Sequence, residues 1–226
     1  MLRTAWLIAR KDLRGEVRSR GVTNQVLPFA GVTMIIFGFA LDANTDVLEL
    51  VAPGLVWLAT MFSLLLLVQR TFDVESADGA LDAMRVAGGD ARASFLGMAI
   101  GRAVQRFVPE SLLLLAAVVL YAETIPLDGA VLLVTTLISA TCGLTAVGTL
   151  YGGLAAGSKG RETLLPLLTL PAVAPVLIGA TRAVESALGT GTATSSDGWQ
   201  WVGLLTVFAV AFGVGGALAF GPLIDE

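Results

Sequence analysis

The sequence predicts an all-α integral membrane protein with six transmembrane helices, folded as a single domain over residues 1–226. Composition is the first reason, because 55% of the residues are hydrophobic, only 14% are charged and the mean hydropathy is +0.81. A soluble domain of this size cannot bury so much apolar surface. The second reason is a series of apolar runs of about 20 residues, the length that a helix needs to cross a bilayer. The third is the one-sided distribution of Lys and Arg among the loops.

Residues 1–20 predict an amphipathic helix that lies in the headgroup layer of the membrane. Apolar residues recur there at helical spacing, and arginines occupy the neighbouring face. The apolar set is Leu2, Ala5, Trp6, Ala9, Leu13 and Val17, and the basic set is Arg3, Arg10, Arg14 and Arg18. A secretory signal peptide is the alternative, but its cationic region would be unusually long. We expect either a simple anchor or a lever helix that touches a cytosolic partner.

The apolar runs define the six predicted spans and their orientation. The spans lie near residues 24–41, 50–69, 103–121, 129–151, 163–181 and 199–220. With this parsing, 13 of the 14 Lys and Arg residues fall on the side of the N-terminus, including Arg102 and Arg106, which are counted with the second loop, and only Arg182 lies in the opposite loops. Basic loops stay in the cytoplasm. We therefore expect a multi-pass protein of the cytoplasmic (inner) membrane with both termini in the cytoplasm.

Two spans contain residues that are unusual for a membrane helix. Near the start of the third, Arg102, Arg106 and Glu110 are spaced four residues apart and share one face. An acid at membrane depth suggests function by default, and its neutralisation by Arg106 is the simpler interpretation. The fifth span contains three prolines, which predict a span that is kinked or partly unwound and buried against its neighbours. These prolines, Pro166, Pro171 and Pro175, mark either a moving element or a static bend.

The segment 70–92 interrupts the apolar sequence and holds eight of the 32 charges (14 basic and 18 acidic) of the chain. Within this cytosolic loop, residues 78–87 predict a short helix with Asp78 as its N-cap and two glycines after its end. One face is apolar and the other is mostly acidic, which disfavours binding to anionic headgroups and favours a groove on a protein. The predicted docking residues are Asp78, Gly79, Leu81, Asp82, Met84 and Arg85.

Several chemistries are excluded by residue usage. The chain has no histidine and a single cysteine, Cys142, which rules out histidine-based zinc sites, Ser-His-Asp catalysis, histidine ligation of haem and a disulfide within the chain. The glycine-rich run 152–159 lacks the adjacent Gly and Lys of a Walker A loop. The run 78–85 resembles the aspartate motif of membrane phosphatidyltransferases but lacks its downstream aspartates. We expect a non-catalytic subunit with no catalytic residue, cofactor or metal of its own, surrounded by lipid and not bound to nucleic acid.

Three sequence segments resemble the haem exporter protein B (CcmB) family in order and spacing. They are APGLVW at 52–57, RTF at 70–72 through DGALD at 78–82, and LPL at 165–167 through LPAVAP at 170–175. The resemblance implies the permease subunit of an ABC complex in cytochrome c maturation, with a six-span fold similar to that of ABC-2 exporters.

The resemblance also implies the partners. ATP would be hydrolysed on a separate cytosolic ATPase subunit, whose groove would receive residues 78–87 as a coupling helix. A haem-handling membrane subunit would hold the iron, and a second copy of the permease would complete the transporter. Either haem itself or a haem-loaded chaperone would be the cargo. An ABC-2 exporter of another substrate (lipid, drug or polymer) and a non-transporting assembly scaffold are the alternatives.

Overall fold

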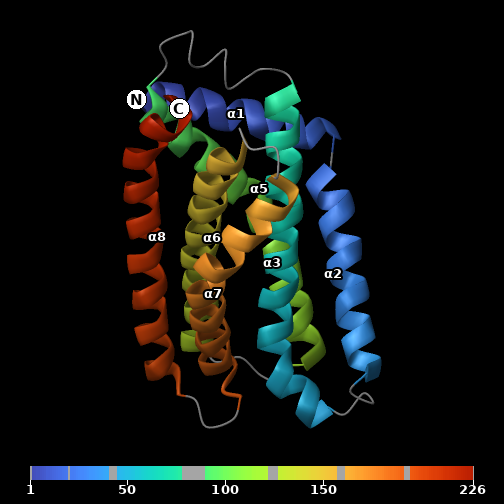
Figure 1. Ribbon diagram of the computed structural model, residues 1–226. Coiled ribbons are helices and arrows are strands. Elements are labelled where there is room, and N and C mark those ends of the chain that lie inside the picture. Colours follow the sequence, from blue (N-terminus) through green and yellow to red (C-terminus); the bar gives the residue numbers. More distant parts are fainter. Residues whose placement is uncertain are drawn as a thin grey trace.

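The computed structural model describes residues 2–19, 21–40, 45–77, 90–121, 127–156, 161–190 and 194–225, and these segments are helical over nearly their whole length. The helices are α1 (Leu2–Ser19), α2 (Gly21–Ala40), α3 (Thr45–Ala77), α5 (Ala91–Tyr121), α6 (Leu127–Ala156), α7 (Arg161–Leu188) and α8 (Ser195–Asp225). Helix α1 lies across one end of the bundle, whereas the others run along its length, and α8 ends at the same end as α1 (Figure 1).

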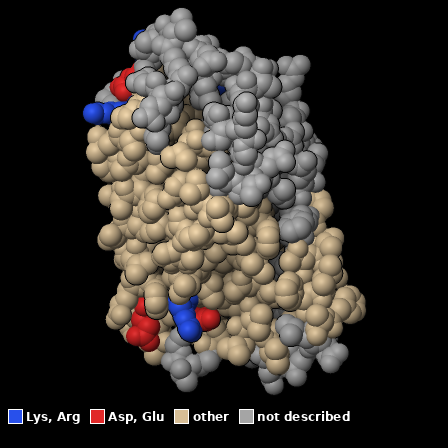
Figure 2. Space-filling view, in the orientation of Figure 1, with Lys and Arg blue, Asp and Glu red and all other residues tan. Residues whose placement is uncertain are grey.

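The surface of the bundle is suited to lipid. Among the described residues, three helices are long and apolar enough to cross a membrane: Leu127–Ala155, Leu165–Leu188 and Ser195–Pro222. Shorter apolar stretches lie at Gly31–Ala40 and Leu50–Leu65. Figure 2 shows that the described charged side chains on this face gather at the two ends, with an uncharged surface between them. Large apolar side chains point outward, and Val119 is 73% exposed. Such a surface is stable in hydrocarbon and not in water, so the chain is a membrane protein.

The core is built around α6, which packs against α3, α5, α7 and α8. A continuous cluster of buried apolar side chains joins these helices. Its members include Trp57 of α3, Leu114 of α5, Leu144 of α6, Val176 of α7 and Leu205 of α8. This packing holds the inner face of α5 against both α3 and α6, which positions the charged residues of α5 inside the bundle.

Helix α1 is attached to α5 through a close contact at Gly97. A Cβ atom at this position would lie 2.6 Å from the carbonyl oxygen of Ala5 and 2.8 Å from the Cβ of Ile8, so only glycine permits this approach. Ala5 and Ala9 are buried, whereas Trp6 is 61% exposed. Part of the face predicted to lie on headgroups therefore packs on protein. Beside this contact, Phe95 of α5 packs against Phe220 of α8, with ring centroids 5.4 Å apart.

Helices α3 and α5 extend furthest beyond their predicted spans. Helix α3 continues to Ala77, and α5 begins at Ala91, well before residue 103. Arg102 and Arg106, which the sequence placed among the basic residues of the second loop, lie within α5 and are buried. Their assignment to the loop is wrong, because hydropathy marks only the apolar part of a helix and charged residues continue it where other side chains bury them. The predicted coupling helix, residues 78–87, lies outside the described residues.

Helix α7 is continuous through all three of its prolines, so of the two predicted forms, kinked or partly unwound, the fifth span has the kinked one (Figure 1). The helix changes direction part-way along its length (Figure 1). Pro166 is half-buried, but Pro171 and Pro175 are exposed, which corrects the prediction that they pack against neighbouring helices. Each proline lacks one helical hydrogen bond, and bending toward or away from that weakened turn is the expected response of the backbone. Whether this bend moves stays a prediction.

Candidate functional site

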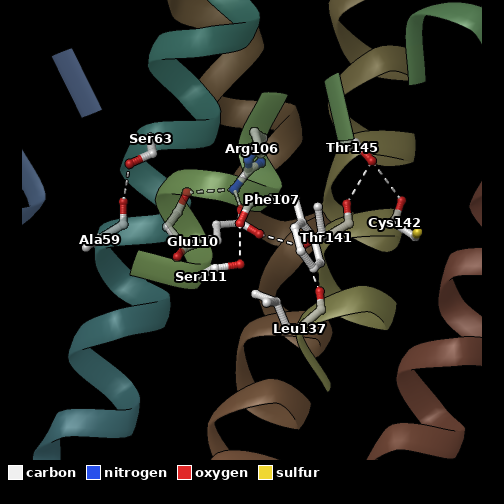
Figure 3. Close-up of polar contacts among 11 residues, drawn as sticks. Ala59, Ser63, Arg106, Phe107, Glu110, Ser111, Leu137, Thr141, Cys142 and Thr145 are labelled. Carbon is white, nitrogen blue, oxygen red and sulfur yellow. Dashed lines mark hydrogen bonds and ion pairs between the residues drawn. The ribbon is translucent and has the colours of Figure 1, made fainter. Parts of the chain in front are cut away.

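The candidate site is a buried ionic contact in the interior of the bundle. Arg106 and Glu110 lie one turn apart on α5, and their side chains form an ion pair with exposed fractions of 2% and 3%. A nitrogen of the guanidinium donates to Oε1 of Glu110. The hydroxyl of Thr141 on α6 donates to Oε2 of the same carboxylate. Figure 3 shows these three side chains pointing toward one another from α5 and α6.

Arg106 extends the contact to a third helix. Its Nη2 atom donates to the backbone carbonyl oxygen of Thr60 on α3 at 3.1 Å. Among the described residues, its Nε and Nη1 atoms have no hydrogen-bond partner. Arg102 lies one turn earlier on α5, is 1% exposed, and places Nη2 3.8 Å from the sulfur of Met98. The interior of the bundle therefore contains two buried guanidinium groups, which come from residues one turn apart on α5.

The helix facing this site carries a row of buried threonines. Thr141, Thr145 and Thr149 follow one another at four-residue spacing on α6, and each donates its hydroxyl to the carbonyl four residues earlier at 2.7 Å. The hydroxyl of Thr141 has a single proton, so it donates either to Glu110 or to the carbonyl of Leu137 at one time. The row gives α6 a polar stripe inside an otherwise apolar bundle.

The free-energy cost of burying an ion pair explains how this contact fixes the positions of three helices. Removing an ion pair from water costs several kcal/mol per ion, and the pair repays this only when further hydrogen bonds satisfy both partners. Here two such bonds come from Thr60 and Thr141, which belong to different helices, while Nε and Nη1 of Arg106 have no partner among the described residues. The contact, which we call the three-helix link (Thr60, Arg106, Glu110 and Thr141), therefore holds α3, α5 and α6 in one relative position. Other positions of these helices would keep the ion pair, which lies within α5, but would remove the hydrogen bonds that Thr60 and Thr141 make to it.

The described part of the chain offers no group of three or more His, Cys, Asp or Glu side chains that could hold a metal ion. The structure brings together two of the residues selected from the sequence, Arg106 and Glu110. The three prolines of α7 take no part in the link. The six predicted docking residues, Asp78, Gly79, Leu81, Asp82, Met84 and Arg85, lie outside the described residues.

Sequence reasoning missed Thr60 and Thr141. Thr60 contributes through its backbone carbonyl, which no side-chain pattern reveals. Thr141 had a usable signal, because threonines recur at positions 141, 145 and 149 in an apolar run and so define one polar face of a predicted helix. Pairing that face with the acid of α5 needed the tertiary arrangement.

A comparison with known protein families identifies the family of this chain. The profile of the family described as CcmB protein matches residues 3–221, which is nearly the whole sequence. The chain belongs to the CcmB family. This match contains every residue of the three-helix link and the segment 78–87.

Three curated relatives of this CcmB-family chain are described as heme exporter protein B. This chain is 29% identical over 170 residues to heme exporter protein B of Rhodobacter capsulatus, and the aligned region covers 74% of this chain and 76% of that protein. It is 27% identical over 209 residues to heme exporter protein B of Haemophilus influenzae, covering 90% and 94% of the two chains. Heme exporter protein B of Paracoccus denitrificans is 26% identical over 211 residues, covering 92% and 95%. Resemblance to the family was thus correctly inferred from the three short segments.

Proposed function

We propose that this CcmB-family chain is the permease subunit of an ATP-driven complex for haem export or haem-chaperone release in cytochrome c-type biogenesis. The match over residues 3–221 carries the proposal, together with the relatives named heme exporter protein B. The chain crosses the cytoplasmic membrane six times with an ABC-2-like arrangement and is itself non-catalytic. A cytosolic ATPase subunit hydrolyses ATP, a haem-handling membrane subunit holds the iron, and two copies of the permease form the transporter.

The arrangement of α3 and α5 supports a route for transmitting force. Helix α3 ends at Ala77 and α5 begins at Ala91, so these two helices bound the segment that receives the ATPase in this proposal. The same two helices are joined inside the bundle by the hydrogen bond from Arg106 to the carbonyl of Thr60. A push on the segment therefore acts on two helices that are linked to each other and, through Glu110 and Thr141, to α6.

The docking role is tested by substitutions on the apolar face of residues 78–87. Leu81→Asp and Met84→Asp are each expected to abolish co-purification of the ATPase subunit in mild detergent, because an unpaired carboxylate in an apolar groove loses its hydration. Val86→Asp is the matched control, since helical spacing places residue 86 on the opposite face. Mass spectrometry of the purified complex measures the ATPase retained and identifies the other subunits.

The outcomes separate the candidate functions. Retention of the ATPase by both Leu81→Asp and Met84→Asp would show that this segment is not the docking site. An ATPase recovered together with a haem-handling subunit supports the proposal. An ATPase without a haem-handling subunit favours an exporter of another substrate, and recovery of neither favours a passive scaffold.

The orientation is tested by cysteine labelling in a Cys142→Ser background. Thr194→Cys, at the exposed start of α8, is expected to react with a charged maleimide added to intact spheroplasts. Arg14→Cys, on the exposed side of α1, is expected to react only after the membrane is permeabilised. The native Cys142 is exposed on the side of α6, where surrounding lipid excludes the reagent, so the unmodified chain should stay unlabelled. Labelling of Arg14→Cys in intact spheroplasts would reverse the assigned topology.

A further inference from the structure

A pocket of 340 Å³ lies between α3 and α7, away from the three-helix link. Its apolar wall includes Trp57 and Leu58 of α3 and Leu177 and Ile178 of α7. Gly54, Thr181 and two charged residues of α7, Arg182 and Glu185, complete the lining. The volume is in the range of about 300–1,000 Å³ typical of small-molecule sites. The combination of a long apolar wall and a charged rim is suited to an amphiphile.

The pocket opens toward the surroundings of α7. Ile178, which forms part of its wall, is 57% exposed. Helix α7 runs from the end of the bundle that carries α1 to the opposite end (Figure 1), and Arg182 and Glu185 lie in its last two turns. The apolar wall therefore faces hydrocarbon, whereas the charged rim lies nearer the headgroups. Amphipathic molecules of the bilayer can enter from the side with this same orientation.

The rim carries both signs of charge. Nη1 of Arg182 lies 2.9 Å from Oε2 of Glu185, and the two side chains are 61% and 17% exposed. A headgroup that is only anionic would be attracted by the guanidinium of Arg182 but repelled by the carboxylate of Glu185. A zwitterionic headgroup satisfies both, with its phosphate on Arg182 and its cation on Glu185. A primary ammonium also donates hydrogen bonds to the carboxylate, which a quaternary ammonium cannot.

We propose that this pocket binds phosphatidylethanolamine from the bilayer. The headgroup lies on Arg182 and Glu185, and the part of an acyl chain nearest the glycerol lies against Leu58 and Ile178. The rest of the lipid remains in the membrane, because the pocket holds only a segment of it. This inference rests on the placement of α3 and α7 in a membrane and is independent of haem export and of ATPase docking.

The test is native mass spectrometry of the full chain, released from detergent in the presence of phosphatidylethanolamine or phosphatidylglycerol with identical acyl chains. Ile178→Trp fills the pocket from an exposed position, so it should fold normally and lose the bound phosphatidylethanolamine. Leu167→Trp is the matched control, because Leu167 is an exposed residue of the same helix outside the pocket lining. It should retain the lipid at the level of the unmodified chain.

A second variant tests the headgroup assignment. Glu185→Gln removes the carboxylate and leaves the guanidinium, so the ratio of bound phosphatidylglycerol to phosphatidylethanolamine should rise by up to about fivefold, the upper limit for the energy of an exposed ion pair. Equal binding of the two lipids by the unmodified chain would overturn the headgroup assignment. Retention of phosphatidylethanolamine by Ile178→Trp would overturn the site.

Discussion

Glu110→Ala is expected to lower the free energy of unfolding by about 3–5 kcal/mol, because it leaves the guanidinium of Arg106 buried without its carboxylate. Arg106 is 2% exposed and cannot reach water without displacing α3 or α6. The hydroxyl of Thr141 also loses its acceptor on α5. Unfolding in mixed micelles with increasing sodium dodecyl sulfate, followed by circular dichroism, measures the change.

Two controls show whether the effect comes from the buried charge. Glu185→Ala breaks the partly exposed pair with Arg182 and should cost only about 0–1 kcal/mol. The double variant Arg106→Met, Glu110→Met removes both charges together and should recover most of the stability lost by Glu110→Ala. If Glu110→Ala is no less stable than Glu185→Ala, the three-helix link does not hold the bundle together.

The double variant also separates stability from function. If it is stable but fails to support cytochrome c maturation in a strain that lacks the native chain, the link has a role in the working cycle. Full activity of this stable variant would make the link purely structural. Because the double variant is stable, a loss of activity could not be attributed to unfolding.

Gly97→Leu is expected to detach α1 from α5. A Cβ atom at residue 97 would lie 2.6 Å from the carbonyl oxygen of Ala5, and backbone cannot move aside as a flexible side chain can. Overpacking of this kind typically costs about 1–3 kcal/mol. Hydrogen–deuterium exchange of the amides of residues 2–19 is the direct measurement, and these amides should exchange faster in the variant.

Gly15→Leu provides the matched control for this prediction. Gly15 lies on α1 itself, is exposed, and has no atom within 4 Å of the position that a Cβ would take. The substitution removes a helix-disfavouring glycine, so exchange in α1 should stay the same or slow. Equal acceleration in Gly15→Leu and Gly97→Leu would mean that the contact with Gly97 does not hold α1 in place.

Prediction from the sequence succeeded where hydropathy alone decides where a helix lies. The apolar runs that became α6 and α8 were predicted within a few residues of their centres, because their length and hydropathy leave few alternatives. Helix ends were less predictable. Helix α5 begins at Ala91, where Asp90 accepts a hydrogen bond from the backbone N–H of Arg92, and its first turns pack on α1 and α8, contacts that hydropathy does not record. Pro171 and Pro175 were expected to be buried, but their outward position depends on how α7 is rotated in the bundle.

The sequence by itself determined that this chain is helical and belongs in a membrane, since apolar runs of about 20 residues satisfy their backbone hydrogen bonds in hydrocarbon by forming helices. Its short motifs also indicated the CcmB family. Only the tertiary structure decided which groups meet. The spacing of Arg106 and Glu110 allowed a pair on one helix face, but burial of that pair required the carbonyl of Thr60 and the hydroxyl of Thr141. These come from residues 46 and 31 positions away along the chain. Contacts over such separations arise from helix packing, which a one-dimensional pattern does not contain.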